Sequence, residues 1–300
     1  MVNRALATPH MAINWYPGHM ATARKAAADS MHKVDVVIEV LDARVPYSSC
    51  NPMFETLRRQ GQRPALKLLN KADVADPQRT RQWLQHYNAQ DGVKAISLCA
   101  KKPANVKRIP QLCQTMLPER GTALKPLRMM ILGIPNVGKS TLMNALLNRH
   151  VANVGDEPAI TKNQMFHEIA PGMSLLDTPG MLWPGMTQYV SYKLAATHSI
   201  GRAAYDNDEV AEHLAAYLVE HYPSLLEQRF GPLPPSCDAH KLLETIAQVR
   251  HLAKKSGGLD IPRAATTLVN EFRAGTLGAI TLETVEQVAA LEPVAQTARK

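Results

Sequence analysis

A glycine-rich motif at residues 133–140 restricts the fold of this chain more than any other part of its sequence. It reads Gly-Ile-Pro-Asn-Val-Gly-Lys-Ser and matches the pattern G-x-x-x-x-G-K-[S/T]. An apolar run at 127–132 precedes it and a helical pattern follows from residue 140. Glycines let backbone N–H groups surround phosphates, and the following helix points its positive end at them. The strand–loop–helix setting therefore predicts a phosphate-binding loop.

The residues of this loop have separate expected roles. Lys139 is expected to reach the β- and γ-phosphates of a nucleotide, and Ser140 to ligate Mg²⁺. The backbone around them is expected to wrap the phosphates. The predicted nucleotide site of the loop comprises Asn136, Val137, Gly138, Lys139, Ser140 and Thr141.

A second motif, Asp-Thr-Pro-Gly at 177–180, follows the apolar run 173–176. An aspartate at a strand end can hold Mg²⁺ through water, and the N–H of Gly180 can sense a γ-phosphate. The pattern D-x-x-G is common on its own. Asp177 follows Gly138 by 39 residues and stands at a strand end, which makes it the expected partner of the phosphate loop.

A third motif, Asn-Lys-Ala-Asp at 70–73, ends a strand-like run that begins at residue 65. The carboxylate of Asp73 can accept hydrogen bonds from N1 and the exocyclic N2 of guanine, which adenine cannot match. Mismatched buried donors are costly, so this predicts GTP and GDP as ligands. The stem of Lys71 is expected to cover the base and Asn70 to brace the loop. The segment 97–101 is expected to offer an N–H to guanine O6, with no single residue assigned.

The order of these motifs is unusual, because the guanine-reading motif lies 60 residues upstream of the phosphate loop. The three motifs together resemble those of the translation-factor class of P-loop GTPases, in which the phosphate loop comes first, so this order predicts a circularly permuted GTPase domain. The permutation is physically allowed because ligand loops in an open α/β fold share one edge of the sheet, and moving the chain ends does not move that edge.

Apolar runs at 34–41, 65–69, 95–99, 127–132 and 173–176 alternate with helical stretches. Such alternation predicts an α/β fold, a mostly parallel sheet with helices on both faces. After about residue 205, apolar residues recur at three- and four-residue spacing, which is typical of helices. We therefore predict a permuted GTPase domain at 11–204 and a small all-α domain at 205–300.

Charge and cysteine content narrow the functional classes. The net charge of +8 divides into +12 for residues 1–204 and −4 for residues 205–300. This asymmetry fits a polyanionic partner such as RNA, although simple solubility explains it equally well. The four cysteines fit neither a zinc site nor a disulfide framework, which favours reduced thiols in a cytoplasmic protein. No apolar run reaches the roughly 20 residues of a membrane span.

Several further segments match one known family in their residues and in their order along the chain. Together with the three motifs, they make the chain resemble the ribosome biogenesis GTPase A family, from about residue 11 to residue 283. The segments are Trp15-Tyr-Pro-Gly-His19-Met20, Asp42-Ala-Arg44-Val-Pro46, Thr161 in Ala-Ile-Thr-Lys, and Phe272-Arg-Ala-Gly-Thr-Leu-Gly278.

The resemblance implies a role in late assembly of the large ribosomal subunit, with GTP hydrolysis tied to release or maturation. The implied partners are ribosomal RNA and proteins, and a monomer is expected. Thr161 is implied as the switch threonine that closes on Mg²⁺ and the γ-phosphate. Asn136 resembles the asparagine with which related GTPases bind K⁺ near the phosphates.

The residue after Gly180 is Met181, where many GTPases carry a glutamine that orients the attacking water. By resemblance, His19 is the candidate for this catalytic role, since a neutral imidazole can hydrogen-bond water. The competing interpretation is a histidine that only packs or contacts RNA.

Two other functions compete with a ribosome-dependent GTPase. An RNA-binding assembly scaffold could retain a structural, slowly hydrolysed guanine nucleotide, and a P-loop kinase could use the same phosphate loop. The guanine chemistry of Asp73 argues against the kinase. For RNA contact, the segment 101–128 carries seven Lys/Arg and one Glu, and Arg250, Lys254 and Lys255 form a second candidate that is equally explained as a solvated helix face.

Overall fold

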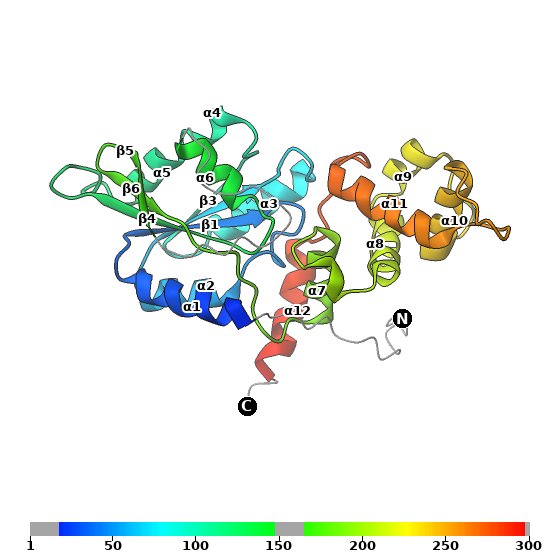
Figure 1. Ribbon diagram of the computed structural model, residues 1–300, viewed down its shortest axis with the longest axis horizontal. Helices are drawn as coiled ribbons and strands as arrows, with labels where there is room; N and C mark the ends of the chain where they lie inside the picture. The colour runs from blue at the N-terminus through cyan, green and yellow to red at the C-terminus, as the bar shows by residue number, and fades with distance from the viewer. Residues whose placement is uncertain (1–17, 148–164, 298–300) are drawn as a thin grey trace.

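A six-stranded sheet in the order β3-β2-β1-β4-β6-β5 lies at the centre of the nucleotide-binding half of the molecule (Figure 1). The computed structural model describes residues 18–147 and 165–297. The four pairings among the first five strands of that order are parallel, and β5 pairs with β6 antiparallel. The strands are β1 (Val36–Asp42), β2 (Ala65–Asn70), β3 (Val93–Ser97), β4 (Leu127–Leu132), β5 (Phe166–Ala170) and β6 (Met173–Leu176).

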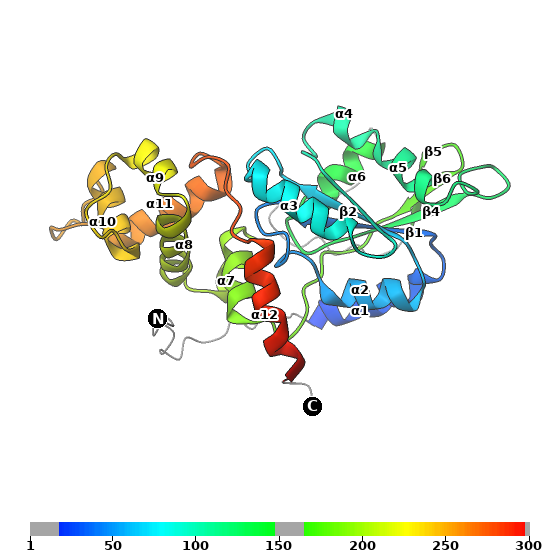
Figure 2. The ribbon, with the colours of Figure 1, turned by 180° about the vertical axis from the view of Figure 1, so that it is seen from behind.

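Helices cover both faces of the sheet, as the continuous apolar strands predict (Figures 1 and 2). Along β1, Ile38 and Val40 face one apolar cluster while Val37 faces the other. Helices α1 (Gly18–Met31) and α2 (Pro52–Gln60) cover one face; α5 (Ile109–Met116) and α6 (Lys139–Leu147) cover the other, next to the short α4 (Pro103–Val106). Helix α3 (Pro77–Asn88) packs beside β3. The predicted α/β class is confirmed.

The sheet differs from the sequence-based expectation in two places. The strand β5 was not expected; it is a short edge strand whose residues are exposed or only partly buried, and its hydropathy shows no clear alternation. The third strand occupies 93–97 instead of 95–99. In the sheet, Ala65 of β2 pairs with Val93 and Leu69 pairs with Ser97. These pairings between strands set the bounds of β3, and the local apolar run at 95–99 holds no information about them.

The C-terminal part is helical, as expected from its apolar spacing. Helices α8, α10 and α11 pack on one another and bury residues that recur every three or four positions, such as Leu242, Ile246, Leu268 and Phe272. An aspartate caps the N-terminus of each of the three. The helices are α7 (Gln188–Ala196), α8 (Asn207–His221), α9 (Pro223–Phe230), α10 (Ala239–Val249) and α11 (Ile261–Ala274). We call α8–α11 the helical region; the domain boundary after residue 204 stays a prediction.

Residues 280–283 bring the chain back from the helical region to the sheet, and we call them the 280–283 strap. The N–H of Ile280 donates to the carbonyl of Val74 at 3.1 Å, and that of Leu282 to the carbonyl of Arg44 at 2.7 Å. Thr281 donates its hydroxyl to the carbonyl of Ala43 at 3.0 Å. The strap therefore joins the loops that follow β1 and β2. Beyond it, α12 (Val285–Thr297) contacts α3.

Within residues 18–147 and 165–297, no helix combines the length and the apolar character that crossing a bilayer requires.

Candidate functional site

The guanine-reading motif and the phosphate loop meet at the carboxyl ends of the strands. The side-chain amide of Asn70 donates to the carbonyl of Val137 at 2.7 Å, and its oxygen accepts the N–H of Ala100 at 2.9 Å. Asn70 thereby joins the phosphate loop to the loop after β3. Gly138 has φ +103°, and a Cβ there would lie 2.2 Å from the Asn70 amide nitrogen, so only glycine fits this approach.

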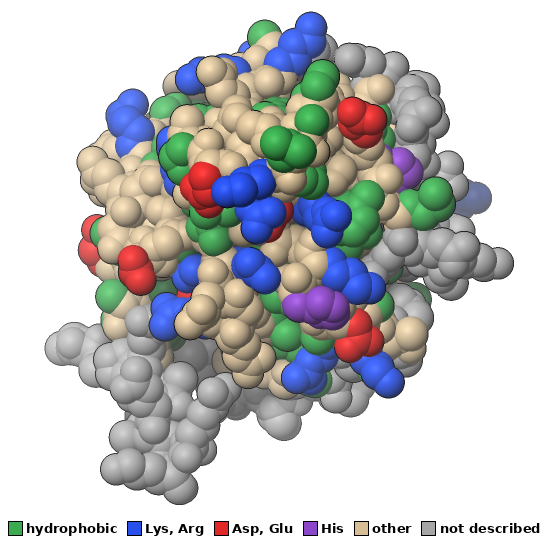
Figure 3. Space-filling model, turned by 90° about the vertical axis from the view of Figure 1, so that its left-hand side faces the viewer, with side chains coloured by type: hydrophobic (Ala, Val, Ile, Leu, Met, Phe, Trp, Pro, Cys, Tyr) green, Lys and Arg blue, Asp and Glu red, His purple; other side chains and the backbone are tan. Residues whose placement is uncertain are grey.

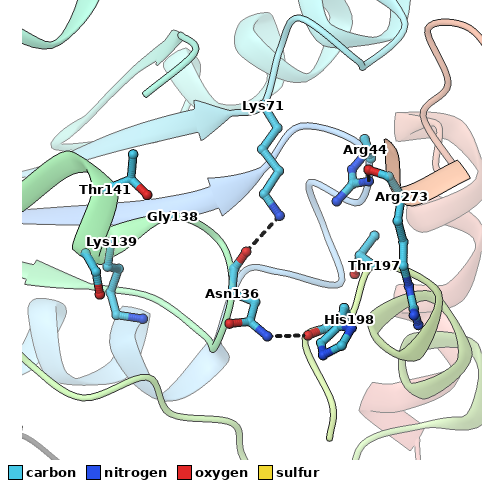
Figure 4. Close-up of a pocket in the computed structure, with 10 residues that line it drawn as sticks. Arg44, Lys71, Asn136, Gly138, Lys139, Thr141, Thr197, His198 and Arg273 are labelled. Carbon is cyan, nitrogen blue, oxygen red and sulfur yellow. Dashed lines mark hydrogen bonds between the residues drawn. The ribbon is translucent and has the colours of Figure 1, made fainter. Parts of the chain in front are cut away.

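Lys71 forms a second link between the two motifs. Its ammonium donates to the backbone carbonyl of Asn136 at 2.7 Å and to Oδ2 of Asp42 at 2.8 Å (Figure 4). The guanidinium of Arg44 binds both carboxylate oxygens of Asp42, at 2.9 and 2.8 Å. Burial alone would raise the pKa of Asp42, but the charges and hydrogen bonds of Arg44 and Lys71 outweigh it and lower this pKa. Asp42 is thus a buried anion that holds Lys71 over the pocket.

Lys139 is folded into its own loop. Its ammonium donates to the carbonyls of Gly133 at 2.9 Å and Ile134 at 2.8 Å. Burial lowers the pKa of Lys139 to about 8, against the opposing charge of Asp177. Burial also raises the pKa of Asp177, and here the charge of Lys139 opposes the shift. Lys139 therefore stabilises the negative charge of Asp177, and Asp177 stabilises the positive charge of Lys139, on the phosphate side of the site.

The segment 177–180 lies directly against the phosphate loop. A Cβ on Gly180 would come within 3.0 Å of the backbone of Pro135 and 3.1 Å of the Lys139 ammonium. The N–H of Met181 donates to the carbonyl of Gly133 at 3.3 Å. All three motifs thus converge in space despite their permuted order in the sequence.

A cavity of about 370 Å³ opens between these loops (Figure 4). Six of its lining residues belong to the nucleotide site expected from the sequence, and four do not. The six are Lys71, Asn136, Gly138, Lys139, Ser140 and Thr141; the four are Arg44, Thr197, His198 and Arg273.

The four additional residues form a wall that local sequence motifs do not predict. The side-chain amide of Asn136 donates to the carbonyl of His198 at 2.8 Å, just beyond α7. Arg273 of α11 binds the last carbonyls of α7, those of Ala196 at 2.9 Å and Ala195 at 2.8 Å. Its own carbonyl accepts a hydrogen bond from Arg44 at 3.3 Å. The resemblance motifs at 42–46 and 272–278 contained two of these residues without assigning them a role.

The remaining predicted site residues lie outside this cavity. Asp73 is exposed and does not line it. The N–H of Ala100, in the segment expected to contact guanine O6, is engaged by Asn70. The backbone of His19 lies in the first turn of α1, whereas its side chain and the whole of Thr161 fall outside the described residues.

Comparisons with known proteins agree with this geometry. Residues 128–249 match a family model described as 50S ribosome-binding GTPase. The chain is 36% identical over 285 residues to Ribosome biogenesis GTPase A of Bacillus cereus, a match that covers 92% of this chain and 95% of that protein. The chain belongs to the ribosome biogenesis GTPase A family. As a member of this family it is a GTP hydrolase.

Two further relatives of the family extend the comparison. Mitochondrial ribosome-associated GTPase 1 of Bos taurus is 34% identical over 299 residues, covering 90% of this chain and 88% of that protein. The crystal structure of GNP-bound YlqF from Thermotoga maritima superposes with a TM-score of 0.61 at 24% identity, covering 88% of this chain and 98% of that chain. The structural likeness supports the fold.

GTPases of this class require Mg²⁺ with the nucleotide, and the donors here suit that ion. Among the described residues, no group of three or more His, Cys, Asp or Glu side chains could hold a metal by itself. Ser140 lies in the first turn of α6, directly after Lys139, and Asp177 presents a partly buried carboxylate near Lys139. A few oxygen donors completed by phosphate oxygens are the ligands that Mg²⁺ prefers.

Proposed function

We propose that this protein binds GTP in the cavity between its guanine-reading motif and its phosphate loop, and hydrolyses it during late assembly of the large ribosomal subunit. The pair of contacts from Asn70 to Val137 and from Lys71 to Asn136 carries the proposal. They bring a base-binding loop within hydrogen-bonding distance of a phosphate-binding loop. The relatives' names supply the ribosomal partner.

Base recognition falls to the loop that follows β2. Asp73 is exposed at this loop, so both guanine donors can reach its carboxylate when the base arrives. Lys71 is already held by Asp42 and needs little reorganisation to cover the base. A pre-positioned lysine loses less conformational freedom on binding, which favours affinity.

Phosphate binding falls to Lys139 and the helix it begins. In the structure its ammonium binds two backbone carbonyls, and phosphate oxygens of the nucleotide replace these neutral acceptors with charged ones. Ser140, Thr161 and Asp177 would hold Mg²⁺, directly or through water. The ion supplies neutralisation of charge that develops on the phosphate oxygens during transfer.

The attacking water needs an orienting group other than Met181. The Met181 side chain is fully buried and its carbonyl accepts the Asn51 amide at 2.9 Å, so it is a packing residue. We assign the catalytic orientation of the water to His19, whose backbone lies at the start of α1. A His19→Ala variant should lower the turnover number with little change in GTP affinity, and a purely structural histidine would change both or neither.

We also propose that a K⁺ ion binds near the phosphates of the nucleotide, with Asn136 as one of its ligands. Its amide nitrogen is engaged by His198, and Figure 4 shows its side-chain oxygen directed away from that bond. A neutral oxygen beside the phosphates suits a monovalent cation. Replacing K⁺ by Na⁺ at equal ionic strength should lower GTP turnover, and equal rates in the two salts would remove K⁺ from the proposal.

We further propose that the protein acts as a monomer in the cytoplasm. All four of its cysteines are free, which suits a reducing compartment.

The test of the ribosomal role is GTP turnover and co-sedimentation with and without purified large subunits. We expect co-sedimentation to depend on GTP and turnover to rise with subunits. Lys139→Ala should lower turnover by roughly 10²–10³-fold, as expected for loss of one charged donor at the transferring phosphate. Lys193→Ala is the matched control, because burial also lowers the pKa of Lys193 to about 8 but this lysine lies outside the cavity.

If the protein instead binds subunits equally with and without nucleotide, and subunits do not raise its GTP turnover, the result would support an assembly scaffold.

A further inference from the structure

The amino edge of the sheet, opposite the cavity, carries a row of cations that the nucleotide site does not use. Arg63 precedes β2, Lys33 precedes β1, and Arg128 is the second residue of β4 and exposed. These three strands are neighbours in the sheet, so the three residues lie along the same edge. We name the set Lys33, Arg63, Arg120, Lys125 and Arg128 the amino-edge patch.

The members of the patch are tied together by contacts at this edge. Asp35 accepts the N–H of Arg128 at 2.8 Å and lies 3.4 Å from the guanidinium of Arg120. Arg63 donates to the carbonyl of His32, the neighbour of Lys33, at 3.5 Å. Lys125 closes the turn at 121–125 by bonds to Gly121 and Thr122. The patch is therefore one surface, and blue side chains gather across this end of the molecule in Figure 3.

Most of this charge is not neutralised within the described residues. Asp35 is nearly buried and is shared between Arg120 and a backbone N–H. Lys33, Lys125 and Arg128 are exposed, and none of them forms an ion pair with another residue of the described ranges. Holding several like charges together is unfavourable unless a polyanion or salt screens them.

The patch also carries apolar and aromatic surface. The Arg128 guanidinium lies 5.9 Å from the centroid of the Phe166 ring, and that ring is itself exposed. Leu124, at the tip of the 121–125 turn, is 95% exposed. Arginine beside an aromatic ring offers a surface on which an unpaired base can stack, in addition to phosphate contacts.

We propose that the amino-edge patch binds RNA, through phosphate contacts from its cations and stacking at Arg128 and Phe166. The inference rests on the proposed ribosomal function and adds to it the surface that faces RNA. Because the patch and the nucleotide cavity occupy opposite edges of the sheet, RNA here leaves the cavity open for GTP exchange. The helical region, by contrast, is net acidic, and its Arg250 pairs with Glu271 at 2.7 Å.

The test compares two variants with equal loss of charge. The patch variant loses three exposed cations, by the substitutions Lys33→Ala, Lys125→Ala and Arg128→Ala. The control variant loses three exposed cations of the helical region, by Lys254→Ala, Lys255→Ala and Arg263→Ala. Binding to protein-free large-subunit ribosomal RNA is measured over a salt series. We expect only the patch variant to bind more weakly, by about tenfold or more, and its log K against log salt slope to fall by about one for each lost contact.

The controls separate this inference from the ribosomal proposal. Intrinsic GTP turnover without RNA should be unchanged in both variants, which excludes misfolding. If the wild-type protein fails to bind subunits, the proposed function is wrong. If the wild-type protein binds and both variants retain its affinity and salt slope, the RNA surface is wrong. Weaker binding to intact subunits with unchanged binding to protein-free RNA would also overturn it, because the partner would then be a ribosomal protein.

Discussion

The cavity loops and the helical region hold together by different interactions. In the loops, the buried carboxylate of Asp42 is bound by Arg44, two residues further along the chain, and by Lys71 from the loop after β2. In the helical region, stability comes from apolar residues at helical spacing, and the charged residues remain on the surface. The comparison shows that the site depends on specific polar pairs, whereas the helical region depends on patterned burial, which tolerates more substitution.

The largest expected effect comes from removing the anion at the centre of the loops. Asp42→Ala leaves Arg44 and Lys71 without their partner, and an uncompensated buried charge costs about 3–5 kcal/mol of unfolding free energy. Urea unfolding monitored by fluorescence measures this loss. Asp29→Ala, on the exposed face of α1, should change stability by no more than about 0.5 kcal/mol. Equal effects of the two variants would contradict the special role of the buried pair.

The second effect tests the apolar packing of the helical region. Leu268 is fully buried in α11, and Leu268→Ala should cost about 2–5 kcal/mol through lost burial and a cavity. We expect the helical signal in circular dichroism to melt at a lower temperature, while the affinity for GDP at 25 °C stays at the wild-type value. If the affinity for GDP also fell, the cavity loops and the helical region would unfold as one unit, and the two regions would not differ as described.

A smaller effect probes the place where the two regions touch. Gly275 ends α11 with φ +76°, and a Cβ there would lie 2.4 Å from a methyl carbon of Val74 in the guanine-reading loop. Gly275→Ala should cost about 1–3 kcal/mol and also weaken GTP binding, because Val74 must move. Gly257→Ala is the matched control: its φ is +91°, but no atom lies within 4 Å of the added Cβ. That control should lose stability without losing affinity.

The smallest effect concerns pH. The pKa of Lys139 is lowered by burial to about 8 in the nucleotide-free protein, and the phosphates of a bound nucleotide raise it. Binding therefore takes up a proton above pH 8, and affinity for GDP should fall as pH rises from 7 to 9, by at most about tenfold per pH unit. Calorimetry in buffers of different ionisation enthalpy measures the proton uptake. In Lys139→Arg, whose side chain stays charged, the fall should disappear.

The sequence was sufficient to predict the central sheet and the phosphate loop, because both depend on local patterns. Apolar runs marked five of the six strands, and β5 was missed because an edge strand of five exposed or partly buried residues carries no clear alternation. Motif spacing also brought Lys71, Asn136 and Lys139 into one cavity. The wall formed by His198 and Arg273 could not be predicted, because it depends on how α7 and α11 dock, and that docking uses backbone carbonyls that any residue possesses.

The 280–283 strap has a consequence for the order in which the protein is made. Thr281 follows Asp76 by 205 residues, and its hydroxyl accepts the Asp76 N–H directly after the guanine-reading motif. A chain leaving the ribosome exposes the loops of the cavity long before the segment that braces them has been translated. The loops of a nascent chain shorter than residue 283 therefore lack the strap contacts that Thr281 and Leu282 make in the folded protein.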